Sequence, residues 1–252
     1  MNKVVQKNRR NPNIFNHFSS YSKKEDNLFQ FNYNRFDSFQ RLIKNNSPIS
    51  YKQDKIIKQN LAFIRLINVL PKKISLDIYI NRTKFISNLT YKDSTQYLTL
   101  PSGVQIVEIF KTNDQSKPIH SEQLTLLAEQ NYTIAIGHNF DQISLFSYMD
   151  NNSLPQGEAK IRFINLSPNS PNLDFAVKAG EGDVVFPNVP YRKASEYLPI
   201  SPMTVNLEIR LTGTKTIIFP LYKSKFEENI VYDLISVGCV EENPKFEVIT
   251  LF

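Results

Sequence analysis

Cysteine is almost absent from this 252-residue sequence, because Cys239 is its one thiol. A single cysteine excludes a disulfide within the chain and any metal site built from several thiolates. The three histidines, His17, His120 and His138, are far apart in the sequence and show no metal-ligand spacing. Stability must therefore come from packing, and the sequence predicts no metal and no organic cofactor.

Long hydrophobic runs are also missing, since no apolar stretch approaches the roughly 20 residues that cross a bilayer. The first residues, MNKVVQKNRRNPNIFNHF, are basic but lack the apolar core of a secretory signal. We therefore expect synthesis in the cytoplasm without a signal peptide. No nucleophile stands in a recognisable catalytic pattern: Cys239 ends a β-type run and is expected to be a small buried hydrophobe. The sequence accordingly predicts a protein that is not an enzyme.

Positive charge is confined to the start of the chain. Residues 1–60 hold 12 Lys/Arg and 4 Asp/Glu, a net charge of +8 against +6 for the whole chain, which leaves residues 61–252 slightly acidic. The same segment is rich in Asn, Gln, Lys and Ser, a composition typical of disordered or loosely attached chain. We call residues 1–60 the basic arm. Its charges are dispersed, so they do not favour nucleic acid as a partner.

One piece of the basic arm, residues 27–43, has helical periodicity. Its apolar residues recur at about i, i+4, i+7, and they are Phe29, Tyr33, Phe36, Phe39 and Ile43. This spacing predicts a short amphipathic helix if a surface receives it. Three alternatives stay open: packing on the protein's own first domain, docking on a protein partner or a neighbouring subunit, and disorder throughout.

The rest of the chain is a duplication. The stretch IRFINLSPNSPNLDFAV at residues 161–177 has a looser copy, IRLINVLPKKISLDIYI, at residues 64–80, 97 positions earlier. Both copies contain Arg-x-x-Asn, a turn with proline and a Leu-Asp-apolar run. The similarity extends over the whole length, which indicates two complete folds. Further equivalent pairs are Arg65 and Arg162, Asp77 and Asp174, Tyr91 and Tyr191, and Tyr97 and Tyr197.

Short β-type runs separated by turns fill each copy. In the first copy we expect strands at about 61–67, 76–80, 84–87, 95–100, 104–110, 119–127, 131–137 and 142–148. Many short strands without a helical period between them predict an antiparallel β-sandwich. The predicted organisation is a basic arm (1–60), a first sandwich (61–150), a linker (151–158) and a second sandwich (159–252).

Four polar positions in these strands are expected to have structural roles. Alternation places Arg65 and Asp77, like Arg162 and Asp174, away from the cores, so each Arg can meet its Asp across a sheet if the strands are neighbours. The paired tyrosines bracket a loop before a strand. A buried tyrosine commonly ties such a corner through its hydroxyl. The alternative is an aromatic surface for a sugar or a protein partner.

These motifs carry a resemblance to a known family. The Arg-x-x-Asn, Ser167-Pro-Asn-Ser-Pro171 and Leu173-Asp174-apolar-x-Val177 series resembles the bacterial domain-of-unknown-function family 4397, over about residues 61–252. The resemblance implies tandem immunoglobulin-like β-sandwiches, often on secreted or surface proteins, with no established catalytic activity. It is weaker in the first copy, where Val69-Leu-Pro-Lys-Lys-Ile74 replaces the Ser-Pro-x-x-Pro turn. The expected fold is therefore all-β, with two tandem sandwiches after a mostly disordered or partly helical arm.

Two functional hypotheses follow. The first is a non-enzymatic structural or assembly protein of a bacterial cell-surface or spore layer, which associates through the basic arm. A spore layer, assembled from inside the mother cell, would reconcile a surface-type fold with the missing signal peptide. The second is a binding module that recognises a glycan or peptide through loops at one end of a sandwich.

Overall fold

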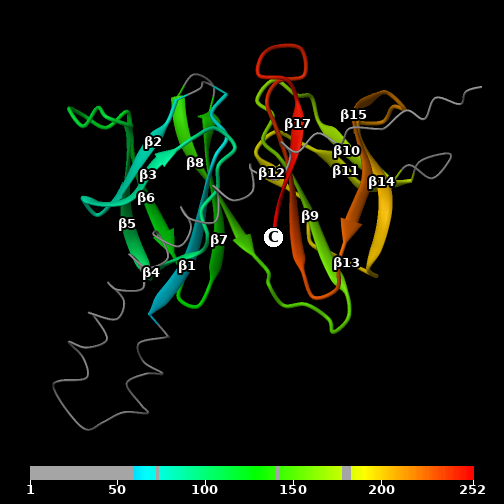
Figure 1. Ribbon diagram of the computed structural model, residues 1–252, viewed down its shortest axis with the longest axis horizontal. Helices are drawn as coiled ribbons and strands as arrows, with labels where there is room; N and C mark the ends of the chain where they lie inside the picture. The colour runs from blue at the N-terminus through cyan, green and yellow to red at the C-terminus, as the bar shows by residue number, and fades with distance from the viewer. Residues whose placement is uncertain (1–59, 72–73, 140–141, 178–182) are drawn as a thin grey trace, which may run out of the picture. The chain divides into compact units, whose positions relative to one another are not determined.

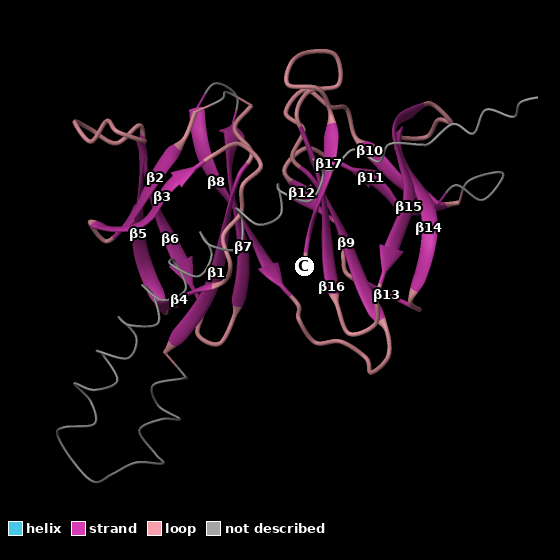
Figure 2. Cartoon of the chain, viewed as in Figure 1, coloured by secondary structure: helices cyan, strands magenta, loops and turns pink. Residues whose placement is uncertain are grey.

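The computed structural model describes residues 60–71, 74–139, 142–177 and 183–252. Every regular element within these ranges is a β-strand, and none is a helix (Figure 2). The prediction of an all-β protein is therefore confirmed. The basic arm lies outside the described residues up to residue 59, and so do all five apolar residues of its predicted helix.

The first repeat contains eight strands, as expected from its short apolar runs. They are β1 (Leu61–Asn68), β2 (Leu76–Ile80), β3 (Thr83–Leu89), β4 (Leu98–Pro101), β5 (Gly103–Lys111), β6 (His120–Leu126), β7 (Asn131–Asn139) and β8 (Gln142–Asp150). Figure 1 traces them from blue to green. Each predicted strand overlaps one of these eight, and the largest difference is β4, which begins three residues later than expected.

The second repeat has the same strand order with one small addition. Its strands are β9 (Ala159–Asn165), β10 (Leu173–Val177), β11 (Val184–Val189), β12 (Lys193–Ala194), β13 (Leu198–Ile200), β14 (Met203–Leu211), β15 (Ile217–Phe226), β16 (Val231–Val237) and β17 (Glu247–Leu251). The two-residue β12 is the addition. In the first repeat its place is taken by a single bridge between Ile67 and Ser94.

Four sheets result, two in each repeat. One sheet of the first repeat has the order β4-β1-β7-β8, and its counterpart in the second has the order β12-β9-β16-β17, with β13 also paired to β9. We call these two the inner sheets, because their residues contact each other. The outer sheets have the orders β3-β2-β5-β6 and β11-β10-β14-β15.

The inner sheets differ from the fully antiparallel arrangement that the sequence predicts. β1 runs parallel to β7, and β9 runs parallel to β16, whereas every other strand pair is antiparallel. Between β1 and β7 the chain passes through the outer sheet twice, as β2 and β3 and then as β5 and β6, with β4 of the inner sheet in between. β7 then enters the inner sheet from the same end as β1. Alternation of apolar residues carries no information on strand direction, which is why the sequence did not indicate this.

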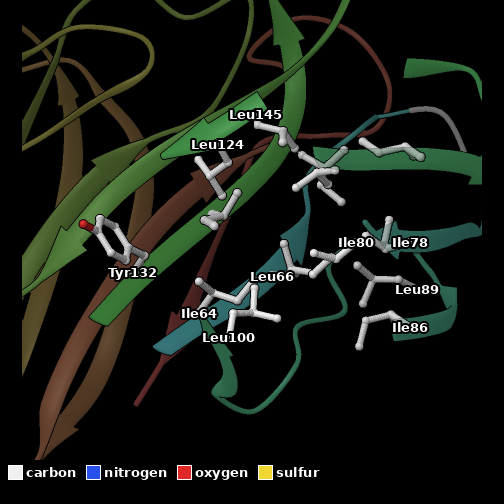
Figure 3. Packing of buried hydrophobic residues seen from close by; sticks show 14 of the residues in the cluster. Ile64, Leu66, Ile78, Ile80, Ile86, Leu89, Leu100, Leu124, Tyr132 and Leu145 are labelled. Carbon is white, nitrogen blue, oxygen red and sulfur yellow. The ribbon is translucent and has the colours of Figure 1, made fainter. Parts of the chain in front are cut away.

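Each repeat buries its own apolar core between an inner and an outer sheet. Figure 3 shows the first core, where Ile64 and Leu66 of β1 pack with Ile78 and Ile80 of β2. In the second core Phe175 lies 5.4 Å from Phe163 and 5.6 Å from Phe186, between ring centroids. Alternation predicts that the residues named here from β1, β2, β9 and β10 are internal, and it makes no such prediction for Phe186. Burying a side chain of this kind contributes about 1.5–3 kcal/mol.

The Asn of the Arg-x-x-Asn motif is buried and ties a loop to the end of a strand. Asn68 accepts a hydrogen bond from the Leu70 amide (3.0 Å) and donates one to the Leu89 carbonyl (3.0 Å). Asn165 makes the two equivalent bonds in the second repeat, at 3.2 and 3.1 Å. The motif is therefore a structural signature, since a buried amide that lost these partners would leave backbone groups unsatisfied.

The Asp of the Leu-Asp motif anchors the strand that follows it. Asp77 accepts hydrogen bonds from Lys84 Nζ (2.6 Å) and from the Asn88 amide (2.9 Å), and Asp174 accepts one from the Asn188 amide (2.7 Å). Asn88 and Asn188 have φ of 58° and 54°, the left-handed conformation that Asn tolerates well. Burial would raise the pKa of Asp77, but these hydrogen bonds lower it below its usual value.

The predicted pairs Arg65 with Asp77 and Arg162 with Asp174 do not form, so that prediction is wrong. β1 and β2 belong to different sheets, as do β9 and β10. The arginines and aspartates therefore point away from each other on opposite sides of a core. The partners of the arginines come instead from the other repeat.

The two repeats pack into a single compact unit, Ile56–Phe252. All seven residues of β9 are buried, although only alternate ones can face the core of their own repeat. The other face of β9 is covered by the first repeat. A strand buried on both faces belongs inside a stack of sheets, which is how the inner sheets contact each other.

Candidate functional site: an ionic cluster between the repeats

An apolar layer joins the two inner sheets. Its buried members are Ile67, Val69 and Ala135 from the first repeat and Ile164, Leu166, Ile235 and Val237 from the second. Partly buried side chains around them include Phe146, Tyr148, Ile249 and Leu251. This layer excludes water from the polar residues that lie beside it on the same strands.

Arg65 extends from β1 of the first repeat into this layer and is only 6% exposed. Its Nε donates a hydrogen bond to Thr133 Oγ1 (2.8 Å), and its Nη2 donates one to Asp233 Oδ2 of the second repeat (2.6 Å). Thr133 is the Cα partner of Arg65 in the parallel pair of β1 and β7. The parallel pairing therefore sets the first contact, and the packing of the repeats sets the second.

Arg162, the equivalent residue on β9, makes more contacts. It holds Asp233 with two hydrogen bonds, Nε to Oδ1 (2.8 Å) and Nη2 to Oδ2 (2.6 Å). It also reaches the first repeat, where Nη2 donates to Asp150 Oδ1 (2.6 Å) and Nη1 to the Met149 carbonyl (2.9 Å). Forked pairs between arginine and carboxylate are among the strongest ion pairs in proteins.

The charges in this cluster are reciprocal. The first repeat supplies Arg65 and Asp150, the second supplies Arg162 and Asp233, and each arginine contacts the other repeat's carboxylate. Both carboxyl side chains are fully buried. Two guanidinium groups and two carboxylates balance in charge. Their mutual attraction and multiple hydrogen bonds offset the cost of desolvating each ion.

Two equivalent tyrosines complete the ionic cluster, which we define as Arg65, Asp150, Arg162 and Asp233 with Tyr97, Tyr197 and Thr133. Tyr97 donates its hydroxyl proton to Asp150 Oδ2 (2.7 Å), and Tyr197 donates its own to Asp233 Oδ1 (3.0 Å). The Arg162 guanidinium lies over the Tyr197 ring, 4.3 Å from its centroid. Burial and the neighbouring carboxylates raise the pKa of both phenols above their usual value.

The electrostatics favour a charged arginine and neutral phenols. Burial would lower the pKa of Arg162, but the Asp233 carboxylate raises it further, so this guanidinium keeps its charge. Each acidic or basic group in the ionic cluster is held by a partner at hydrogen-bond distance. The arrangement fixes one repeat against the other, and Arg65 and Tyr97 also line a small pocket of about 40 Å³.

Reciprocal contacts also surround the ionic cluster. Lys92 of the first repeat pairs with Glu247 of the second, 2.8 Å between Nζ and Oε2, and Tyr191 of the second donates its hydroxyl proton to the His138 carbonyl of the first (2.6 Å). The Tyr91 hydroxyl is buried and has no hydrogen-bond partner among the described residues. Burial raises the pKa of Tyr91 and of Tyr191 to about 12.

The structure thus divides the residues that the sequence singled out. It brings together Arg65, Tyr97, Arg162 and Tyr197, and it places Tyr91 and Tyr191 at the border of the same interface. Asp77 and Asp174 lie elsewhere, on the outer sheets.

Sequence reasoning missed three members of the ionic cluster: Thr133, Asp150 and Asp233. A signal for Asp233 exists, because it is a charged residue in the middle of the otherwise apolar strand VYDLISV. A buried charge in such a strand indicates a partner of opposite sign.

Within the described ranges, no group of three or more His, Cys, Asp or Glu residues is arranged to hold a metal ion. Cys239 is buried, as expected, and burial raises the pKa of its thiol. No helix in the same ranges is long and apolar enough to span a membrane.

Alkaline titration tests whether five tyrosines at and around the interface between the repeats are buried. The phenols of Tyr91, Tyr97, Tyr148, Tyr191 and Tyr197 have raised pKa values in the fold. The unfolded value is about 10. Above that pH the folded state therefore binds more protons than the unfolded state. The contribution of these phenols to the free energy of unfolding is fully present below about pH 10 and is lost as the pH rises further. Ultraviolet absorbance should show these phenols ionising late and together with unfolding. Ionisation of all 12 tyrosines near pH 10 in a protein that stays folded would contradict the burial.

Comparison with known proteins identifies a family. The model of the family described as "Domain of unknown function (DUF4397)" matches residues 62–176, from β1 to β10. This match confirms the family that the sequence motifs resemble over residues 62–176, which is part of the 61–252 that the motifs suggest. No curated protein shows a significant match.

Two solved structures are similar at low identity. The carbohydrate-binding module CBMbc (family CBM26) of Amy13K from Eubacterium rectale, solved with maltoheptaose, is 10% identical over 76% of this chain and 97% of its own, with a TM-score of 0.25. A candidate adhesin from Bacteroides ovatus is 8% identical over 75% and 92%, with a TM-score of 0.22. Neither likeness is close enough to indicate what this chain binds.

Proposed function

We propose that this chain, in which residues 62–176 match the DUF4397 family, is a non-enzymatic structural or assembly protein of a bacterial cell-surface or spore layer. The observation that carries this proposal is the reciprocal ionic cluster between the repeats. Its charged groups are consumed in holding the repeats together. A protein whose buried polar residues serve cohesion suits a load-bearing or spacing role.

The mechanism begins with a rigid body. One repeat can reorient against the other only if Arg65 separates from Asp233 and Arg162 from Asp150. Separating a buried ion pair costs several kcal/mol, because each charge loses its partner while it remains in an apolar surrounding. The two repeats therefore act as one spacer of fixed geometry.

The basic arm supplies the association. It carries +8, whereas residues 61–252 are slightly acidic, so the arm of one chain is attracted to the body of the next. Its five apolar residues, Phe29, Tyr33, Phe36, Phe39 and Ile43, would then be buried against the neighbour. Charge favours the encounter, and burial of aromatic surface provides the lasting affinity.

Removal of residues 1–59 tests this function. We expect the shortened chain to keep its fold and its melting temperature but to lose assembly, measured by light scattering, and to lose its place in the envelope or spore, imaged with a fluorescent tag through growth and sporulation. The matched variants are the triple change Phe29→Ser, Phe36→Ser and Phe39→Ser, expected to behave like the deletion, and the double change Asn32→Ser and Asn34→Ser, expected to behave like the native chain. Correct localisation of the shortened chain would contradict the mechanism.

A second candidate is a binding module for a glycan or a short peptide. A groove of about 260 Å³ lies between the end of β11 and the following loop, lined by Phe186, Pro187, Lys193 and Glu196 among others. Its lining combines apolar side chains with the charged Lys193 and Glu196, a mixture that suits a small polar ligand. Tyr191, suggested by the sequence as a stacking surface, is instead bonded to His138. A glycan-array signal that disappears on Lys193→Ala and Glu196→Ala would favour this candidate.

A further inference from the structure

The contacts between the repeats have the form of a protein–protein interface. Apart from the linker, residues 151–158, the contacts between the inner sheets in the described residues are non-covalent. They include the apolar layer, the ionic cluster, Lys92 with Glu247, Tyr191 with His138, and the Arg192 guanidinium over the Phe146 ring. Every one of these contacts depends on the surfaces that meet and not on which chain provides them. The same surfaces are present on every copy of the protein.

We propose that this interface also forms between chains, so that the first repeat of one copy binds the second repeat of another. The inference rests on the assembly function proposed above and gives it a second contact besides the basic arm. Exchange of identical elements between protomers is a low-cost route to association, because the exchanged contacts are those of the monomer.

The pairing is selective for unlike repeats. Thr133 and Asp233 occupy equivalent positions, as the Cα partners of Arg65 on β1 and of Arg162 on β9. If two first repeats met, each Arg65 would face Thr133 in place of Asp233, so the forked pair that Arg162 makes with Asp233 would be absent, and Asp150 would be the one carboxylate of the ionic cluster left to each arginine. A first repeat therefore prefers a second repeat, because only the second supplies Asp233, the carboxylate that accepts hydrogen bonds from both Arg65 and Arg162.

The linker sets the balance between the closed monomer and exchange. Tethering gives the two repeats of one chain an effective concentration in the millimolar range, so dilute chains close on themselves. In a crowded layer the concentration of neighbouring chains approaches that value, and exchange between chains then competes with closure within one chain. Two copies can exchange reciprocally into a closed dimer, or successive copies can continue as an open chain.

Site-specific cross-linking in the full-length protein tests the proposal. Lys92 and Glu247 are 36% and 45% exposed at their side chains and pair across the interface, so thiols placed there are accessible to a short bis-maleimide. One preparation carries Lys92→Cys and another Glu247→Cys, both with Cys239→Ser. They are mixed, unfolded and refolded together at rising concentration, and then treated with the cross-linker.

A product of twice the chain mass, increasing with concentration, is the expected result. The matched control mixes two preparations that both carry Lys92→Cys, since like sites do not meet at this interface. A cross-site product no stronger than this control would overturn the proposal. If association through the basic arm persists in that case, the proposed assembly function still stands, whereas loss of all association would count against that function too.

A chain without residues 151–158 provides the positive control. Asp150 ends β8 in one inner sheet and Ala159 begins β9 in the other. Packed sheets are about 10 Å apart, whereas consecutive Cα atoms are only about 3.8 Å apart, so this chain cannot close on itself. We expect it to form a dimer that gives the cross-site product. A folded monomer, or a chain that folds only when the linker is restored, would show that the interface does not form between chains.

Discussion

Replacement of Asp233 by alanine should lower the free energy of unfolding by about 3–5 kcal/mol, the cost of removing one partner from a buried ion pair. Asp233 is fully buried and accepts hydrogen bonds from Arg65, Arg162 and Tyr197. Its loss would leave Arg65 without a carboxylate and Arg162 with Asp150 alone. The midpoint of urea unfolding, monitored by circular dichroism, measures the effect.

Glu227→Ala is the matched control for Asp233→Ala. Glu227 also accepts a hydrogen bond from a cation, Lys225, but its side chain is 53% exposed. Exposed ion pairs contribute at most about 1 kcal/mol. Equal effects of the two substitutions would mean that water reaches Asp233, and the ionic cluster would then not hold the repeats together.

Gly238→Ala should destabilise the second repeat by more than about 3 kcal/mol, a loss typical of severe backbone clashes. Gly238 has φ of 74°, and a Cβ there would lie 2.2 Å from the Lys245 carbonyl oxygen and 2.9 Å from that of Pro244. Both obstacles are backbone atoms, which cannot rotate away. The Gly238 carbonyl also accepts a hydrogen bond from Ser167 Oγ (2.6 Å), so a shift here would spread to the loop after β9.

Gly213→Ala separates backbone strain from collision. Gly213 has nearly the same φ, 72°, but no atom lies within 4 Å of a Cβ built there. Its substitution should cost only about 1–2 kcal/mol, the penalty for a left-handed residue with a side chain. Thermal unfolding measures the stability of both variants. Similar losses of stability would show that the loop from Cys239 to Lys245 moves easily and is not packed against Gly238.

The fold was largely predictable because both repeats show local sequence patterns, namely alternation of apolar residues and recurring turn residues. Period-2 alternation located the strands of the first repeat and placed Ile64, Leu66, Phe163 and Phe175 in the cores. Turn residues such as Asn88 recur as Asn188 with the same backbone conformation. These features depend on residues close together in the sequence, where a pattern is informative.

The ionic cluster was not predictable in the same way. Arg65 meets Asp233 across 168 positions of sequence, and no local pattern specifies such a contact. Alternation predicts that one face of each strand meets solvent, and on that basis it pairs Arg65 incorrectly with Asp77. The adjacent apolar residues Leu66 and Ile67, like Phe163 and Ile164, carried the missing signal, because two neighbours of opposite orientation are both buried.

Differential scanning calorimetry of the native protein tests most directly whether the repeats form one rigid body. The account predicts one transition for residues 60–252, with equal calorimetric and van't Hoff enthalpies, because neither repeat can unfold without exposing the buried charges of the other. Two separate transitions, each with the enthalpy of a single sandwich, would contradict it.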